Sequence, residues 1–201
     1  MDTSLPSDGS MSDRVYSQDG SICTPKDLTG FLPPAFTPPV PTQNVCTPAQ
    51  IQAFYANCVG DQSTIPGCQL WSANNKSCNA CVATADSATA WGALVYAADG
   101  YRTNPSGCIA TLGFLDCAKR EDALWACTDA ACHENCPPDP DGGSDSYEAC
   151  RTAAASSVCK VYKAEVDAAC PMDGASIALC LQSDLQKFYM AFAPILCSSG
   201  G

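Results

Sequence analysis

Cysteine is the residue type of this chain with the widest range of possible chemistry. The 201-residue sequence contains sixteen cysteines, an even number, and one histidine, His133. Thiols at this density persist as disulfides in oxidising compartments, whereas reduced thiols bind soft metals. The even number and the spread along the chain predict a disulfide framework. Its members are Cys23, Cys46, Cys58, Cys68, Cys78, Cys81, Cys108, Cys117, Cys127, Cys132, Cys136, Cys150, Cys159, Cys170, Cys180 and Cys197.

The spacing of the cysteines indicates how they pair. Many follow one another about ten residues apart, as Cys117 and Cys127 do. Residues ten apart on one helix are separated by about 15 Å, whereas a disulfide joins Cα atoms about 4.4–6.8 Å apart. Each helical cysteine is therefore expected to bond to another element. The spacing of Cys117 with Cys127, and of Cys170 with Cys180, is similar to that of the twin Cx9C proteins, which staple two antiparallel helices.

The segment around His133 is where an enzyme interpretation can begin. A histidine can act as a general base, and an acidic neighbour can bind calcium. The string His-Glu-Asn-Cys at 133–136 is similar to the His-Asp-x-Cys end of secreted phospholipase A2 sites, although Asp129 and Ala130 stand where that family has paired cysteines. The resemblance implies a calcium-dependent hydrolase with His133 as base and Glu134 as calcium ligand. The alternative is a surface histidine between two disulfide-bonded cysteines.

A second cysteine pattern around the same histidine is similar to a c-type haem attachment motif. Cys127, Cys132 and His133 follow a Cys-x4-Cys-His order, whereas the usual motif is Cys-x2-Cys-His. Met172 or Met190 would then be the second haem ligand. The competing interpretation assigns both cysteines to disulfides, and we expect no cofactor.

Two further thiol interpretations stay open. Cys78 and Cys81 have the spacing of a redox dithiol, although no strand is expected before them as in thioredoxin-like units, and bonds to two different neighbours fit as well. A helical chain rich in cysteine also resembles bacterial copper-storage proteins, which implies Cu(I) bound by thiolates. Cysteines at one-turn spacing occur here only at Cys78/Cys81 and within 127–136.

Acidic residues around a double glycine form a candidate calcium site. Asp139, Asp141 and Asp145 lie in a Pro- and Gly-rich segment, but the residues after Asp139 do not follow the EF-hand order of ligands and glycine. A solvated acidic linker is the alternative. We expect no bound metal.

Aromatic residues near helix ends and loops form a candidate ligand-binding surface. Exposed aromatic rings stack on sugars or anchor protein partners, and core packing is the alternative role. The candidates are Trp71, Tyr96, Tyr101 and Tyr147.

The charge and the apolar pattern exclude some partners. The formal net charge of −11 repels phosphate backbones and anionic lipid, so nucleic acid is not expected as a partner. The longest apolar runs, such as 190–197, fall short of the roughly 20 residues of a membrane span. No secretory signal follows Met1, which we interpret as an added start codon on a trimmed mature chain.

The sequence predicts a leader followed by a helical domain. Residues 1–45 are expected to form a disordered, Pro-rich leader and tether, stiffened over Phe31–Pro41 and pinned to the body at Cys23. Residues 46–201 are expected to form a disulfide-stapled helical domain, with possible subdomains over 46–136 and 145–197.

Cap signals and apolar spacing predict the helices. Thr47 and Gln50 form a capping box with proline at the first helical position, so a helix is expected over Pro48–Val59. Others are expected over Asn79–Ala98 with Gly100 as its C-cap, over Cys108–Asn135 as one helix or two, over Asp145–Pro171, and from Asp173 or Ser183 to Phe192. The predicted fold is an all-α, disulfide-rich bundle of about five to six helices.

These observations favour a secreted or surface-tethered binding or structural module without enzymatic activity. Its expected partner is an extracellular protein or a matrix component. The alternatives are a thiol-based Cu(I) storage bundle and a calcium-dependent hydrolase that uses His133.

Overall fold

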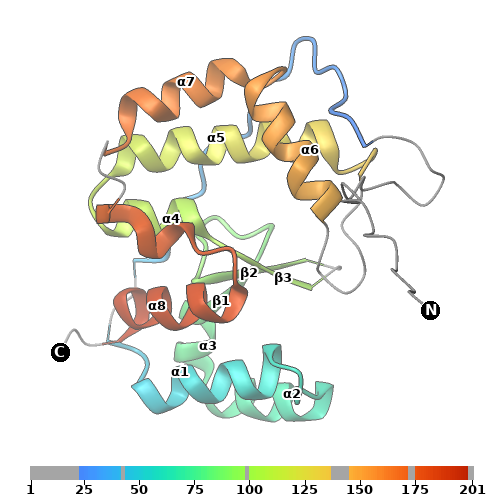
Figure 1. Cartoon of the computed structure of the whole chain (residues 1–201). Helices are drawn as coiled ribbons and strands as arrows, with labels where there is room; N and C mark the ends of the chain where they lie inside the picture. Colours follow the sequence, from blue (N-terminus) through green and yellow to red (C-terminus); the bar gives the residue numbers. More distant parts are fainter. Residues whose placement is uncertain (1–22, 42–43, 98–99, 137–144, 172–174, 199–201) are drawn as a thin grey trace, which may run out of the picture. The chain divides into compact units, whose positions relative to one another are not determined.

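A computed structural model of the chain describes residues 23–41, 44–97, 100–136, 145–171 and 175–198 (Figure 1). The chain divides into two compact units, the first comprising Met1–Phe31 and Cys127–Lys160 and the second Leu32–Ala126 and Val161–Gly201. All sixteen cysteines are paired, and each of the eight disulfides closes within one unit. The eight bonds and the predominance of helix confirm that the chain is a disulfide-rich, mostly helical protein.

The first helices of the second unit have ends that follow local sequence signals. α1 (Pro48–Phe54) starts at the predicted capping box, in which the Gln50 backbone N–H donates to the Thr47 hydroxyl and the Thr47 N–H donates to the Gln50 side chain. It continues as a π-helix, η1 (Tyr55–Val59), so the expected span is confirmed. α2 (Ile65–Asn74) and α3 (Lys76–Val82) follow.

The segment expected as a helix over Asn79–Ala98 is mostly sheet, and this prediction was wrong. α3 ends at Val82, and a three-stranded sheet of β1 (Ala83–Ala85), β2 (Leu94–Ala97) and β3 (Gly100–Thr103) follows (Figure 1). β1 pairs in parallel with β2, and β2 pairs antiparallel with β3. Gly92 packs so closely that a Cβ atom there would lie 2.5 Å from the Cys81 carbonyl oxygen. Gly100, expected as a helix C-cap, instead opens β3 with φ at +126°.

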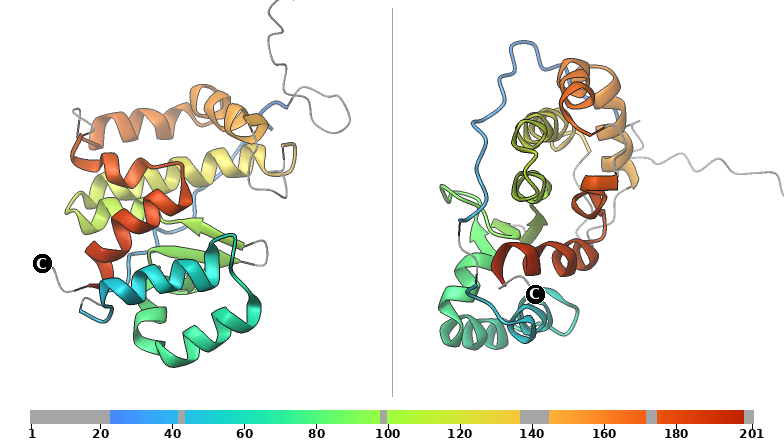
Figure 2. Two further views of the ribbon diagram at one scale, coloured as in Figure 1. Left: turned by 60° about the horizontal axis from the view of Figure 1, so that its bottom comes forward. Right: turned by 90° about the vertical axis from the view of Figure 1, so that its left-hand side faces the viewer.

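Five more helices belong wholly or mainly to the second unit, and one of them, α7 (Lys160–Ala169), is described below. The segment for which the sequence left one helix or two open forms two helices, α4 (Pro105–Thr111) and α5 (Leu115–Cys132). η2 (Ala175–Leu181) is a 3-10 helix, and α8 (Leu185–Cys197) starts at the Asp184 cap and runs past the predicted end at Phe192. α8 packs against α1 (Figure 2) and also contacts α3 and α4.

Serine hydroxyls explain why the helix predicted over Asp145–Pro171 is divided. α6 (Asp145–Ser156) ends before a turn at 157–159, and α7 begins at Lys160 and ends at Ala169. The Ser157 hydroxyl donates to the Ala153 carbonyl at 2.6 Å, and the Cys159 N–H donates to the Ala154 carbonyl. Hydroxyls that compete for carbonyls in this way favour helix ends.

The fold class needs correction in two respects. The described residues contain nine helical segments when α1 and η1 are counted as one, where five to six were expected. They also contain the three-stranded sheet, so the fold is mostly helical instead of all-α. Residues 1–22 of the expected leader, and the predicted linker 137–144, lie outside the described residues. Cys23 is bonded to Cys136, and the leader's limit at residue 45 stays a prediction.

Aromatic side chains fill the core of the second unit. Phe54 is fully buried, and its ring meets those of Trp71, Tyr101 and Tyr189 at centroid distances of 5.2, 5.9 and 5.7 Å. These three rings come from α2, β3 and α8. The core therefore fixes α2 and β3 relative to α1 and α8.

Candidate binding surface

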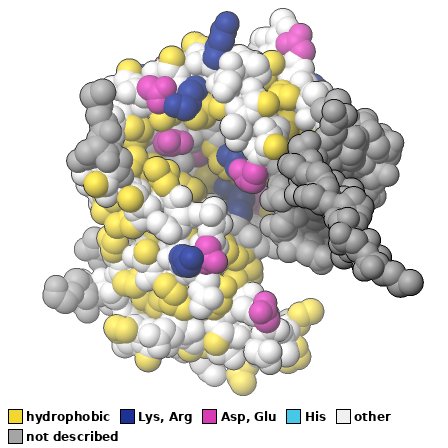
Figure 3. All heavy atoms as spheres, in the orientation of Figure 1, with side chains coloured by type: hydrophobic (Ala, Val, Ile, Leu, Met, Phe, Trp, Pro, Cys, Tyr) yellow, Lys and Arg dark blue, Asp and Glu magenta, His cyan; other side chains and the backbone are white. Residues whose placement is uncertain are grey.

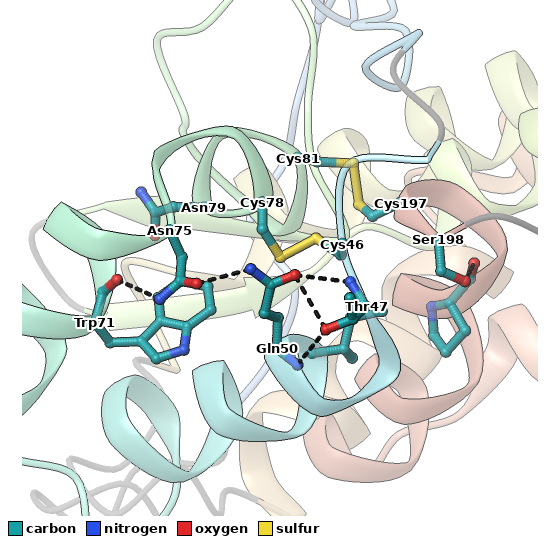
Figure 4. Close-up of a disulfide and its surroundings, with 12 residues drawn as sticks. Cys46, Thr47, Gln50, Trp71, Asn75, Cys78, Asn79, Cys81, Cys197 and Ser198 are labelled. Atoms are coloured by element: carbon teal, nitrogen blue, oxygen red, sulfur yellow. Dashed lines mark hydrogen bonds between the residues drawn. A yellow bond between two sulfur atoms is a disulfide. The ribbon is translucent and has the colours of Figure 1, made fainter.

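A chain of hydrogen bonds fixes the C-terminal end of α2 to the start of α1. Asn75, which follows α2, donates its side-chain N–H to the Trp71 carbonyl at 2.8 Å. The Gln50 amide of the capping box donates to the Asn75 side-chain oxygen, also at 2.8 Å (Figure 4). The Cys46–Cys78 disulfide joins the residue before the Thr47 cap of α1 to α3 in the same view. The end of α2 is therefore held by side chains as well as by the buried Trp71.

The N-terminal end of α2 is fixed by a cap and a disulfide. The Thr64 hydroxyl accepts the Gly67 N–H at 3.1 Å, and Pro66 occupies the first turn, where its missing N–H leaves no helical bond unmade. Cys68, one residue further on, is bonded to Cys58 of η1. Both ends of α2 are thus tied to α1 and η1.

The outer face of α2 is exposed and uncharged. Ile65 and Leu70 are 76% and 65% exposed, and four other α2 residues are exposed with them. Successive members lie one or three positions apart and alternate members four apart, which places them on one side of the helix. We call this set the α2 face; it comprises Ile65, Pro66, Gln69, Leu70, Ala73 and Asn74.

The sequence around the α2 face is poor in charge. Residues 46–85 contain two charged side chains, Asp61 and Lys76, where the chain average of 15% would give about six. In Figure 3 the surface over α1, α2 and α8 is mostly apolar or neutral, with few acidic or basic side chains. The charged residues are concentrated in other parts of the sequence.

A pocket opens beside the first turn of α2. Its volume is about 320 Å³, and the Cys58–Cys68 disulfide, Ile65 and Tyr101 supply the apolar part of its lining. Hydroxyl and amide groups supply the polar part. These groups belong to Ser63, Thr64 and Gln69.

A tyrosine of β2, Tyr96, packs against Tyr101 of this lining. The ring of Tyr101 meets the ring of Tyr96 at 6.1 Å, and Tyr96 is 44% exposed. Burial raises the pKa of Tyr101 above its ordinary value, and the charge on Tyr96 would raise it further. Tyr101 therefore presents a neutral hydroxyl at physiological pH. The pocket offers an apolar ring and neutral hydrogen-bonding groups, which suits an uncharged side chain of a partner.

The four aromatic candidates from the sequence fall in three places. Tyr101 lines the pocket, and the ring of Tyr96 contacts the ring of Tyr101. Trp71 has the alternative role in the core: it is 8% exposed because its indole packs edge-on against Phe54. Tyr147 belongs to α6 of the first unit, where its hydroxyl donates to Asp129, and its pKa is raised by burial and by this bond.

His133 lies at the end of α5 in the first unit. Its Nδ1 is 3.6 Å from the Asp129 carboxylate, and its ring meets Tyr147 edge-on at 6.5 Å. Glu134, the implied calcium ligand, pairs with Lys26, and this hydrogen bond lowers the pKa of the Glu134 carboxyl. A histidine beside a carboxylate is compatible with base chemistry, and the hydrolase stays a prediction.

The thiol-based alternatives conflict with the pairing of the cysteines. Copper storage requires free thiols, and none is free. Cys127 and Cys132, the proposed haem attachment pair, are bonded to Cys159 and Cys150. The suggested redox pair Cys78 and Cys81 is likewise bonded to two different partners, Cys46 and Cys197.

The predicted calcium site falls largely outside the described residues. Asp139 and Asp141 are not among them, and Asp145 is the first residue of α6. Within the part of the chain that the structure describes, no three His, Cys, Asp or Glu side chains converge as a metal site would require. The same described part contains no helix that is long and apolar enough to cross a membrane.

Comparison with known proteins gives no relative for this chain: no family model, no curated protein and no solved structure matches it.

Ile65 and Leu70 were not among the candidates predicted from the sequence. Their apolar side chains resemble those of core residues until their exposure is known. The available signal was the low charge of residues 46–85, which is unusual in a chain of net charge −11.

Proposed function

We propose that the chain is an extracellular binding module that contacts a protein partner through the α2 face and the adjoining pocket. The observation that carries this proposal is the exposure of two large aliphatic side chains, Ile65 and Leu70, on a helix without charged residues. The centres of protein interfaces are depleted in charge, and contiguous exposed apolar surface marks interaction sites. The eight disulfides fit an oxidising, extracellular environment.

The chemistry of the α2 face favours a protein over a polysaccharide. Sugars are bound mainly by stacking on aromatic rings and by dense polar contacts, and no aromatic ring belongs to the α2 face. Anionic matrix polysaccharides would also be repelled by the net charge of −11. Aliphatic side chains gain most of their binding energy from burial against another apolar surface.

The attachment of α2 supports the same proposal. The Cys58–Cys68 bond, the Thr64 cap and the Gln50–Asn75 hydrogen bond hold both of its ends in place. A surface fixed in its bound conformation loses little conformational entropy on binding. The α2 face is therefore suited to rigid docking.

A displayed library of constrained peptides tests the proposal against glycans. Peptides are selected on the oxidised protein, and glycans are assayed in parallel on an array. Selected peptides are expected to bind wild type and to lose at least about tenfold in affinity with Leu70→Glu, which corresponds to about 1.4 kcal/mol. Leu181→Glu is the matched control because Leu181 is 51% exposed on η2 of the same unit. Equal effects of both variants, or binding of glycans alone, would contradict the proposal.

A further inference from the structure

One disulfide differs from the other seven in its exposure. Cys58 and Cys68 are both partly exposed, whereas each of the other disulfides has at least one buried cysteine. The Cys58–Cys68 bond also lines the open pocket. We propose that Cys58–Cys68 is a thiol-exchange site, which opens to an external thiol before any other disulfide of the chain and so regulates the α2 face.

The surroundings of the two sulfurs indicate which one is attacked. Cys68 lies in the first turn of the ten-residue helix α2, where the helix dipole stabilises a thiolate. Cys58 lies at the C-terminal end of the π-helix η1, where the helix dipole disfavours a thiolate. The sulfur that leaves more readily is the one whose thiolate is better stabilised. An external thiolate therefore attacks Cys58 Sγ, and Cys68 leaves as the thiolate.

The complete exchange with a dithiol is balanced in electrons. The first step breaks the Cys58–Cys68 bond and forms a mixed disulfide between Cys58 and the reagent. The second thiolate of the reagent then attacks the reagent's first sulfur, which is bonded to Cys58 in the mixed disulfide. This step releases Cys58 as a thiolate. Two electrons pass from the dithiol to the protein, the reagent becomes a cyclic disulfide, and the protein thiolates take protons from water.

Burial explains why the other disulfides of the second unit resist. Both cysteines are buried in three of them, Cys46–Cys78, Cys81–Cys197 and Cys108–Cys180. Attack on these sulfurs requires the core to open, because a thiolate must approach in line with the sulfur–sulfur bond. In Cys117–Cys170 only Cys170 is partly exposed.

Reduction of Cys58–Cys68 changes the binding surface and spares the core. The bond closes a loop with a sequence separation of 10, and it forms one wall of the pocket. Trp71 and the Gln50–Asn75 bond still hold the C-terminal end of α2 after reduction. The end that carries Ile65 loses its covalent tie. This consequence for binding rests on the proposed function, whereas the exchange reaction does not.

Timed reduction of the full, oxidised chain under native conditions tests the exchange. The protein is treated with dithiothreitol, quenched with iodoacetamide at intervals and mapped by peptide mass spectrometry. Cys58 and Cys68 are expected to be alkylated first, at least tenfold faster than any other pair. Earlier opening of another pair, or simultaneous opening of several, would overturn the proposal. With the monothiol 2-mercaptoethanol, the adduct is expected on Cys58 and the alkyl group on Cys68; the reverse pattern would overturn the assigned direction.

A double variant separates the regulation from the proposed function. Cys58→Ser with Cys68→Ser is expected to keep the wild-type circular dichroism spectrum and to bind the selected peptides at least tenfold more weakly. Unchanged peptide affinity in a folded double variant would overturn the regulatory role. If no peptide binds wild type through Leu70, the proposed function fails, while the order of alkylation still decides whether the exchange site exists.

Discussion

Replacing Trp71 by alanine tests the packing that places α2. Trp71 is 8% exposed, and its indole meets the Phe54 ring edge-on with 5.2 Å between centroids and 69° between planes. Among the residues of α2, only Trp71 is buried. Trp71→Ala therefore removes the main apolar contact between α2 and the core.

The expected loss follows from the size and burial of the indole. Truncation of a buried aromatic residue to alanine costs about 3–5 kcal/mol, because transfer energy is lost and a cavity remains. The edge-on ring pair contributes about 0.5–1.5 kcal/mol beyond its buried area. For a chain of this length each 1 kcal/mol lowers the melting temperature by about 2–4 °C. Trp71→Ala should thus lower the melting temperature by about 6–20 °C.

Equilibrium urea unfolding with the disulfides intact measures the free energy of unfolding. Leu70→Ala is the internal control, because Leu70 is the preceding residue of the same helix and is 65% exposed. Its expected effect is within about 0.5 kcal/mol of wild type. If Trp71→Ala costs less than about 1 kcal/mol, or if the two variants are destabilised equally, α2 does not dock on the core as described.

Three more substitutions test other contacts of the second unit by the same unfolding assay. Tyr189→Phe should cost about 1 kcal/mol, because the buried Tyr189 hydroxyl donates to a backbone carbonyl of α1 at 3.0 Å; no loss would exclude this bond. Asn104→Ala should cost about 2–4 kcal/mol, because Asn104 caps the Gly107 N–H and donates to the Gly92 carbonyl, both at 2.9 Å; a loss under 1 kcal/mol would contradict that. Burial raises the pKa of Asp122, so the folded state favours the protonated carboxyl. The resulting contribution to the free energy of unfolding is complete below the ordinary aspartate pKa of about 3.9 and is lost as pH rises through the raised pKa. Asp122→Asn should therefore gain stability relative to wild type between pH 3 and pH 7, and a relative loss over this range would refute the sign.

Local signals in the sequence predicted some elements well. Thr47, Pro48 and Gln50 specify a helix start through contacts within one turn, and the structure has this cap. The prediction of a helix over Asn79–Ala98 was wrong because the apolar spacing of this segment fits a helix and a buried sheet equally. The close approach of Gly92 to the Cys81 carbonyl depends on tertiary packing, which the sequence pattern does not encode.

The candidate site was harder to predict than the framework. The sequence predicted aromatic residues as ligand-binding candidates. Trp71, one of them, belongs to the core, whereas its neighbour Leu70 is exposed. Adjacent residues on a helix point about 100° apart, so one can be buried while the next is exposed. Which side of α2 faces the core is decided by Phe54 and the disulfides. Of the features of this site, only the scarcity of charge near α2 can be seen in the sequence alone.

A disulfide map of the native protein tests the covalent framework on which the account rests. Digestion without reduction, followed by mass spectrometry, is expected to give no free thiol and eight bonds, three in the first unit and five in the second. The expected bonds are Cys23–Cys136, Cys127–Cys159, Cys132–Cys150, Cys46–Cys78, Cys58–Cys68, Cys81–Cys197, Cys108–Cys180 and Cys117–Cys170. A bond between Cys78 and Cys81, a bond between cysteines of different units, or several free thiols would contradict the account.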